Sequence, residues 1–367
     1  MINSIQALRG IAAFGVVYSH ANGVIRKRYS ELGLTDPIWE IEQGWSKFGG
    51  GVGVDLFLLL SGFIIFYTGW NKQQDFTQFL TKRFSRIFPI WWVALLGVIA
   101  ISLIPGSSST FNLYEILTSF LLIPISQGGE YQKPILEVGW ALHYIVAFYI
   151  IYAFFSKLDS LKALKLITLF LLSCTLAGLL YSIDAGIWTV LTNPRMLSYA
   201  VGGWMAYWYI NGSIQWSKKL SFFTYSFIAI MSYMFIFQND WRSGIPLTVN
   251  RVPIAAAILF LVLFNPRISK IPLPKFLVAF GGSSYSIYLF HMFPLMIISG
   301  IWKREIFLPS TPPLLTWFIL ILIGVLAGLA AYFIVEKPLQ KIRAPLLFSK
   351  LGKFKLKIGD QSRRLGS

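Results

Sequence analysis

The sequence has little of the chemistry that many soluble enzymes rely on. Its 367 residues include one cysteine and three histidines, and only 13% of them are charged, about half the share typical of soluble domains. Because Cys174 stands alone inside an apolar run, the sequence excludes a disulfide framework and a cysteine-ligated zinc cluster. The shortage of charge excludes an ordinary soluble protein, and we expect no metal cofactor.

Long apolar runs take the place of the missing charge. Apolar residues make up 56% of the chain, and the mean hydropathy is +0.64. We therefore predict an all-α, polytopic integral membrane protein, since about 20 apolar residues form a helix long enough to cross a bilayer. Ten spans are expected, at 4–22, 50–69, 86–104, 137–155, 163–182, 187–210, 219–237, 250–265, 281–301 and 314–335. The run 111–125 is too short to span and is expected to be interfacial or re-entrant.

The net charge of +17 comes mainly from lysines and arginines in short loops, with no soluble module that presents them to nucleic acid. Such residues collect in the cytoplasmic loops of membrane proteins. Here they follow the even-numbered spans, at positions such as Lys72, Lys157 and Lys218, so both termini are expected in the cytoplasm. We expect residues 1–336 to form one transmembrane domain and residues 337–367 a basic cytoplasmic tail that lies against anionic lipid.

The first apolar run carries Arg9 near one end and His20 near the other. Eleven residues correspond to three helical turns, roughly 16 Å, within about 20° of alignment, so both side chains are expected on one face. A guanidinium binds anions, and an imidazole accepts protons near neutral pH. We interpret this face as the wall of a reaction channel. The alternative is that Arg9 snorkels to the cytoplasmic headgroups and His20 is an interfacial residue with no channel between them.

The second span begins with Gly49, Gly50, Gly51 and Gly53, which lack the spacing of a dinucleotide fingerprint. Close helix packing or an unwound start explains these glycines better than contact with a ligand. Asp55 is expected at the depth of His20, where its carboxylate would accept a hydrogen bond from the imidazole and fix its tautomer. Ser61 is expected about two turns deeper, as a channel residue.

Further candidate residues lie in four later segments. Arg83 and Arg86 are three residues apart, hence neighbours on a helix, and paired guanidinium groups suit phosphate, although basic loops of this kind also serve topology alone. Glu137, Trp140 and His143 surround the start of the fourth span, and His291 lies within the ninth; these four are candidates for the acceptor site or the channel. For His291, a buried neutral imidazole bonded to a hydroxyl is the simpler reading. Pro338 is expected to end the tenth span, with Glu336 paired to a cytoplasmic arginine.

Together these segments resemble the acyltransferase-3 family of integral-membrane acyltransferases, most closely its single-domain members that O-acylate bacterial exopolysaccharide or O-antigen sugars. The segments that carry the resemblance are Gln6-Ala7-Leu8-Arg9-Gly10 through His20, Gly53-Val54-Asp55-Leu56-Phe57 to Ser61-Gly62-Phe63, Arg83-x-x-Arg86, Ser284-Tyr285-Ser286-Ile287-Tyr288-Leu289-Phe290-His291 and Glu336-Lys337-Pro338. The resemblance implies a ten-helix fold in which acetyl-CoA or another acyl-CoA enters from the cytoplasm. It implies that Arg83, Arg86 and Arg9 hold this donor, while its acyl end reaches toward His20.

One family segment departs from this pattern. The family form is W-[ST]-L-x-x-E-x-x-F-Y, and here Ile145 stands at the glutamate position while Trp140, Leu142, Phe148 and Tyr149 match. The duty of that carboxylate is therefore absent or transferred, with Glu137 and His143 as the candidates.

The resulting hypothesis is an O-acyltransferase of the bacterial inner membrane. His20 acts as the base, or carries the acyl group transiently, and the acceptor is a hydroxyl of a cell-surface polysaccharide or of its lipid-linked precursor, such as that of lipopolysaccharide. Two alternatives remain open: a transporter or flippase, which many-helix proteins with intramembrane polar groups often are, and a non-catalytic scaffold for polysaccharide export.

Overall fold

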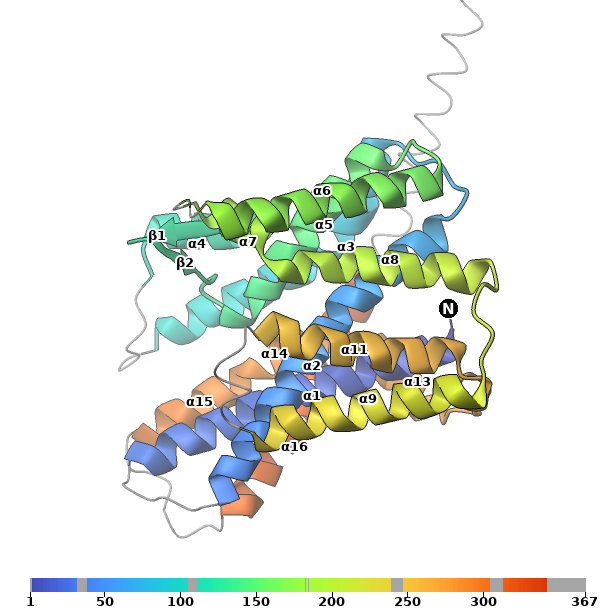
Figure 1. Ribbon diagram of the computed structural model, residues 1–367. Helices are drawn as coiled ribbons and strands as arrows, with labels where there is room; N and C mark the ends of the chain where they lie inside the picture. The colour runs from blue at the N-terminus through green and yellow to red at the C-terminus, as the bar shows by residue number, and fades with distance from the viewer. Residues whose placement is uncertain are drawn as a thin grey trace, which may run out of the picture.

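The computed structural model describes residues 2–31, 38–104, 111–181, 183, 185–238, 247–303 and 313–341. The basic segment 342–367 lies outside these residues, so the predicted tail stays a prediction. The described chain is helical apart from one short hairpin (Figure 1). The long helices are α1 (Asn3–Glu31), α2 (Ile38–Gly69), α3 (Phe76–Ser102), α5 (Trp140–Phe155), α6 (Ser160–Leu180), α8 (Leu197–Ile210), α9 (Lys218–Phe237), α11 (Leu247–Phe264), α15 (Met292–Lys303) and α16 (Pro313–Ala331).

Shorter elements join or interrupt these helices. They are α4 (Leu113–Leu121), β1 (Ile125–Gln127), β2 (Glu130–Gln132), the 3₁₀ turn η1 (Glu137–Gly139), α7 (Gly186–Thr192), the 3₁₀ turn η2 (Pro194–Met196), α12 (Pro266–Ser269), α13 (Lys275–Gly282), α14 (Ser284–Phe290) and the π-helical turn η3 (Tyr332–Glu336). The strands pair antiparallel, with Ser126 opposite Tyr131. The run 111–125 contributes the nine-residue α4, which is far too short to cross a bilayer.

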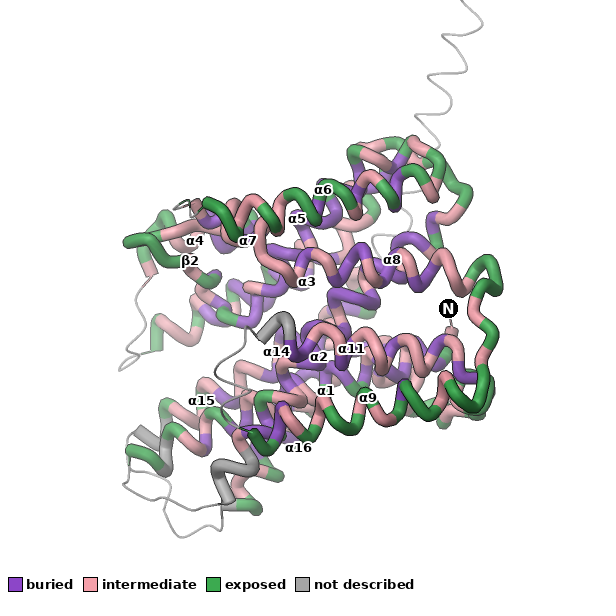
Figure 2. Tube along the Cα trace, viewed as in Figure 1, coloured by how far each residue is buried: buried purple, intermediate pink, exposed green. Residues whose placement is uncertain are grey.

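The helices form two groups that lie side by side (Figure 1). One group contains α3 to α8, and the other contains α1, α2, α9, α11 and α13 to α16. Helix α2 joins the groups, since it packs against α1, α9 and α11 and also against α5 and α8. Buried residues gather on the facing sides, whereas α6 and α9 turn many exposed residues outward (Figure 2). Those exposed residues are largely apolar, as expected where a helix meets lipid.

Glycines allow helices α1 and α2 to pack closely. A Cβ atom on Gly15 would lie 2.5 Å from the carbonyl oxygen of Gly49, and one on Gly53 would lie 2.7 Å from that of Ala12. Helix α2 is continuous from Ile38 to Gly69, so the glycines do not unwind the span. Of the two explanations offered by the sequence, close packing is the one confirmed.

Among the described residues, six helices are long and apolar enough to cross a membrane. The number is seven if residues 275–282 (α13) and the bent segment 284–300 (α14 and α15) are counted as one span. The class of protein is therefore confirmed, and the count of ten is not. The three remaining expected spans correspond to α1, to α7–α8 and to α11. Of these, α8 is short because the chain breaks at Asn193-Pro194, and α11 has an apolar described stretch of fewer than 18 residues.

Two expected spans are broken rather than straight. Asn193 is extended, its side-chain oxygen accepts a hydrogen bond from the Arg195 amide at 3.0 Å, and Pro194 opens η2. The run 187–210 is thus two helices, because an Asx cap followed by proline starts a new helix. The expected span 281–301 is replaced by α13, α14 and α15, with a bend of 57° between residues 275–282 and 284–300.

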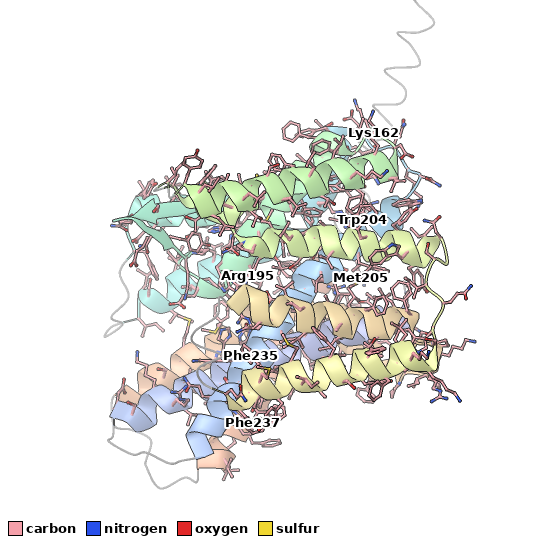
Figure 3. All side chains as sticks on the ribbon, in the orientation of Figure 1. Lys162, Arg195, Trp204, Met205, Phe235 and Phe237 are labelled. Carbon is pink, nitrogen blue, oxygen red and sulfur yellow. The ribbon has the colours of Figure 1, made fainter. Side chains whose placement is uncertain are left out.

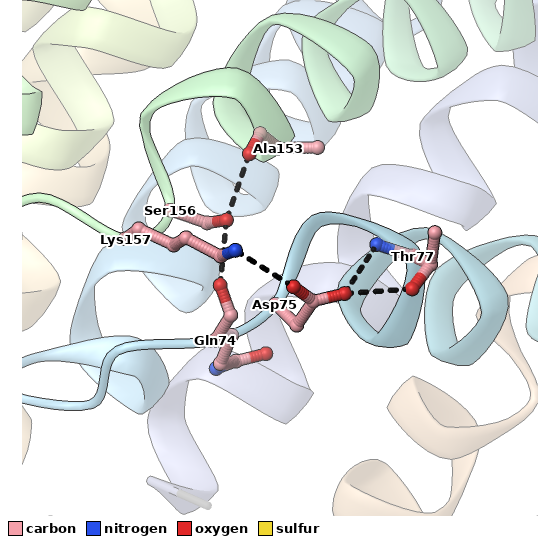
Figure 4. A network of polar contacts seen from close by, with 6 residues as sticks. All are labelled: Gln74, Asp75, Thr77, Ala153, Ser156 and Lys157. Atoms are coloured by element: carbon pink, nitrogen blue, oxygen red, sulfur yellow. Dashed lines mark hydrogen bonds and ion pairs between the residues drawn. The ribbon is translucent and has the colours of Figure 1, made fainter.

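The boundaries of two more spans were predicted incorrectly. Helix α3 begins ten residues before the expected position 86, because Asp75 caps it by accepting a hydrogen bond from the Thr77 amide at 3.2 Å (Figure 4). Pro338 does not end the last span, since helix continues to residue 341. The Lys337 amide donates to the carbonyl of Tyr332, and this wider π turn makes room for the proline ring that an α-helical turn would crowd.

Candidate active site

A pair of histidines from distant segments lies at the centre of the bundle. Nδ1 of His20 on α1 is 2.7 Å from Nε2 of His291, which follows α14, and the two rings are stacked at 9°. The backbone carbonyl of Ile287 lies 2.9 Å from Nδ1 of His291. His291 is fully buried. The predicted burial of this residue is confirmed, but its partners are an imidazole and a carbonyl rather than the predicted hydroxyl.

These contacts fix which ring nitrogens carry protons. A carbonyl oxygen only accepts, so Nδ1 of His291 must donate to Ile287. In the neutral ring, Nε2 of His291 is then the acceptor for a proton on Nδ1 of His20. Nε2 of His20 is left with its lone pair, which is the form that a general base requires. The role that the sequence assigned to Asp55 is therefore filled by His291.

Asp55 binds two arginines instead of His20. Oδ1 of Asp55 is 3.3 Å from Nε of Arg195, and Oδ2 is 3.5 Å from Nε of Arg251. The carboxylate is completely buried, so the attraction between these charges is little screened. Arg195 also lies over the ring of Trp140, 5.1 Å from its centroid, and it occupies the interior between the two helix groups (Figure 3).

The sequence analysis singled out neither Arg195 nor Arg251 as a site residue. The one signal for Arg251 is an arginine within an apolar run, which in a membrane protein marks a functional site by default. Gly51 makes the contact possible, because a Cβ atom there would collide with the guanidinium of Arg251.

His20 and the arginines line two cavities that adjoin. One cavity, of about 150 Å³, is walled by polar groups that include Ser19, His20, Trp140, Arg195 and Arg251. The second, of about 110 Å³, contains Arg9, Arg83 and Arg86 together with many apolar side chains. Val54 and Tyr288 belong to both walls. Arg9 and His20 thus face adjacent cavities, and a single open passage between them stays a prediction.

The arginine cavity has the character of an anion site. None of its wall residues is acidic, and among the described residues the buried Nε of Arg83 has no hydrogen-bond partner. Arg83 lies over the rings of Phe79 and Tyr149, and Arg9 donates to the side chain of Gln6 at 3.1 Å. The predicted neighbours Arg83 and Arg86 are therefore brought together with Arg9, as expected.

Two further residues belong to this cavity. Ser61 is part of its wall and donates to the Phe57 carbonyl of its own helix at 2.8 Å. Ile145, at the position of the family glutamate, also belongs to this wall. Glu137 and His143, the candidates to take over that carboxylate's duty, line a groove beside the hairpin instead, so the transfer stays a prediction.

The groove residues have local partners. Glu137 pairs with Lys133 at 3.2 Å, and Nδ1 of His143 is 2.7 Å from the hydroxyl of Tyr131.

Glu336, expected to pair with an arginine, accepts hydrogen bonds from Ser286 at 2.5 Å and from Gln340 at 2.9 Å. Within the described residues it forms no ion pair, so the expected pairing with an arginine was wrong.

The fold and the site define a polytopic membrane protein whose polar groups converge inside the bundle. A family model described as an acyltransferase domain matches residues 2–333, so the chain belongs to the acyltransferase-3 family. The resemblance seen in the sequence is thereby confirmed, and the protein is an acyltransferase by family.

Three curated proteins are similar to this chain. The exopolysaccharide production protein ExoZ of Rhizobium meliloti is 26% identical over 302 residues, which cover 80% of this chain and 90% of that protein. The putative acetyltransferase ORF330 of Acidianus two-tailed virus is 23% identical over 95% of this chain and 93% of its own length. The peptidoglycan O-acetyltransferase OatA of Listeria monocytogenes is 31% identical over 106 residues, 28% of this chain and 14% of that protein. No solved structure matches the chain.

Proposed function

We propose that this protein is an O-acyltransferase of the bacterial inner membrane that moves an acyl group, most simply acetyl, from acyl-CoA to a hydroxyl of a cell-surface polysaccharide or its lipid-linked precursor. The observation that carries the proposal is the His20–His291 pair, which leaves Nε2 of His20 unprotonated beside a cavity that adjoins three arginines. The names of ExoZ and OatA support a polysaccharide as the acceptor.

The arginine cavity supports acyl-CoA as the donor. CoA carries several phosphate charges at one end and a thioester at the end of a long thin arm. Arg83 and Arg86 bind the phosphates at the predicted cytoplasmic mouth, since guanidinium groups match phosphate oxygens in pairs. The many apolar side chains of this cavity suit the thin pantetheine arm better than the charged nucleotide. Arg9 belongs to the same wall and adds a third positive charge for the donor.

The chemical step is base-assisted acyl transfer. Nε2 of His20 takes the proton of the acceptor hydroxyl as its oxygen attacks the thioester carbonyl. The tetrahedral oxyanion then collapses to the new ester and expels the CoA thiolate, which receives the proton from His20. Base assistance of this kind is worth ~10²–10⁴ in rate, and holding both substrates in adjoining cavities adds proximity.

Arg195 and Arg251 are the candidates to stabilise the oxyanion. Both belong to the wall of the His20 cavity, and Asp55 behind them balances only one of their two positive charges. Fixed positive charge in a site shielded from water stabilises a developing negative charge without reorganisation. Asp55 thus acts as a positioning residue for the arginines rather than as the partner of the base.

Three substitutions test the reaction in purified full-length protein. His20→Ala is expected to lower kcat by at least ~10²-fold while the protein remains folded and binds CoA as before. Arg83→Ala and Arg86→Ala are each expected to raise KM for acyl-CoA by about 10- to 100-fold, the cost of a charged hydrogen bond. Arg267→Ala, an exposed arginine of α12, is the matched control.

The same measurements separate the alternatives. A transporter for another solute has no reason to bind CoA, and a scaffold does not need His20. Near-normal acylation of surface polysaccharide in cells that carry only the His20→Ala variant would refute the proposed mechanism.

A further inference from the structure

A groove of about 410 Å³ lies outside the two reaction cavities, between α4, the β1–β2 hairpin and the start of α5. The hairpin is at the opposite end of the molecule from the α8–α9 connection (Figure 1). The polar residues that line the groove include Glu115, Gln127, Glu130, Tyr131, Gln132 and His143.

One of these residues has an unused polar atom. His143 is only 2% exposed, and its Nδ1 is occupied by the hydroxyl of Tyr131. Among the described residues, Nε2 of His143 has no hydrogen-bond partner. Buried polar atoms are almost always satisfied, so this nitrogen calls for a partner from outside the chain. A hydroxyl suits either tautomer of the ring, because a hydroxyl both donates and accepts.

The charge of the groove restricts what it can bind. Three glutamates and a single lysine, Lys133, line it, so a phosphate or another anion is repelled. Glu115 caps α4, and Glu137 is paired with Lys133. Glu130 and the two glutamines remain to exchange hydrogen bonds with hydroxyl groups, and Phe111 and Tyr131 add apolar faces. This combination fits a neutral or cationic carbohydrate better than a nucleotide or a lipid headgroup.

The groove is connected to the reaction site through the start of α5. Trp140 belongs to the wall of the His20 cavity, and His143, one turn later, belongs to the groove. The hydroxyl of Tyr288, which faces both reaction cavities, donates to the carbonyl of Val138 in η1. A chain bound in the groove therefore has a short route for one of its hydroxyl groups to reach His20.

We infer that this groove is the acceptor subsite, and that it holds an uncharged or amino-sugar stretch of the polysaccharide with His143 bonded to a sugar hydroxyl. The inference rests on the proposed function and names the part of the molecule that selects the acceptor.

The test uses full-length protein in nanodiscs. The acceptor probe is a set of oligosaccharides cut from the surface polysaccharide of a strain that lacks this gene. His143→Ala and Gln127→Ala are expected to raise KM for the oligosaccharides about tenfold, the equivalent of about 1.4 kcal/mol. KM for acyl-CoA and the slow hydrolysis of acyl-CoA without acceptor are expected to stay unchanged. Gln73→Ala, an exposed glutamine between α2 and α3, is the matched control.

The outcomes are distinguishable. If both groove variants keep the wild-type KM for the oligosaccharides while His20→Ala is inactive, the groove inference is overturned and the transferase stands. Because Gln127 is exposed, its variant decides the matter even if His143→Ala fails to fold. If the wild-type protein acylates none of the oligosaccharides, the proposed function fails and the groove inference falls with it.

Discussion

At the scale of single residues, Nε2 of His291 is the hydrogen-bond partner of His20 Nδ1, at 2.7 Å. We expect His291→Ala to lower kcat by between about 10- and 10⁴-fold, because His20 loses the acceptor that holds its tautomer and ring orientation. His291→Gln is expected to recover part of the loss, since an amide oxygen can accept the same proton. The measurement is kcat and KM for both substrates, with the pH profile of kcat.

A purely structural role for His291 predicts a different result. In that case the Ala and Gln variants would lower the thermal unfolding midpoint, while kcat per folded molecule and its pH profile would stay at wild-type values. Helix α1, which carries His20, packs against α14 and α15, which flank His291. A substitution of His291 can therefore also loosen this packing, so thermal unfolding must be measured alongside the kinetics.

The same pair shows what the sequence could and could not supply. It supplied His20 and the three residues of the arginine cavity, Arg9, Arg83 and Arg86, because these lie along one helix or belong to a recognisable segment. It did not supply the partners. Arg195 is 140 residues from Asp55 and His291 is 271 residues from His20, and no local periodicity reports which of several buried polar groups meet across a bundle.

At the scale of elements, the α1–α2 contact is set by glycine, and substitution there tests it. Gly53→Ala is expected to destabilise the protein by about 1–3 kcal/mol, the usual cost of overpacking, since the new Cβ would meet the backbone oxygen of Ala12, which cannot rotate away. Gly23→Ala on α1 is the control, because a Cβ there meets nothing within 4 Å. We expect that control to be neutral or stabilising by up to about 1 kcal/mol. Thermal unfolding in detergent, compared between the two variants, is the measurement.

Acid is expected to weaken the start of α3. Hydrogen bonds from Thr77 and Lys157 hold the pKa of Asp75 at about 2, below its ordinary value of 3.8 (Figure 4). A lowered pKa means that the carboxylate stabilises the folded state fully above about pH 4, and that this contribution is lost as the pH falls toward 2. Asp75→Asn keeps an N-cap acceptor but removes the charge, so it is expected to flatten this part of the stability profile. An identical decline in both proteins between pH 4 and pH 2 would contradict the assignment.

Helix ends and bends were the part of the fold that the sequence concealed. The apolar cores of the long helices were located correctly, because about 20 apolar residues have few alternatives in a bilayer. The start of α3 was missed because Asp75 caps a polar first turn that hydropathy ignores. The continuation of the last helix past Pro338 was missed because a π turn relieves the steric clash with which proline normally ends a helix.

At the scale of the whole molecule, the two ends differ in chemistry. Arg83 and Arg86 enter the bundle near the end where Asp75 caps α3, and Lys218 starts α9 at the α8–α9 connection. The acidic groove lies by the hairpin at the other end. A donor with many negative charges and a neutral acceptor would thus approach from opposite sides, which is what transfer across a membrane requires.

Cysteine labelling tests that arrangement. In a Cys174→Ala background, Gln127→Cys marks the hairpin and Ser213→Cys marks the exposed α8–α9 connection. The positive charges beside residue 213 predict a cytoplasmic position for it. A membrane-impermeant maleimide is therefore expected to label residue 127 in intact spheroplasts, and residue 213 only after the membrane is broken. The reverse pattern would place the arginine cavity on the outer side, where cells keep no acyl-CoA, and the donor assignment would have to be abandoned even if the histidine pair proved essential.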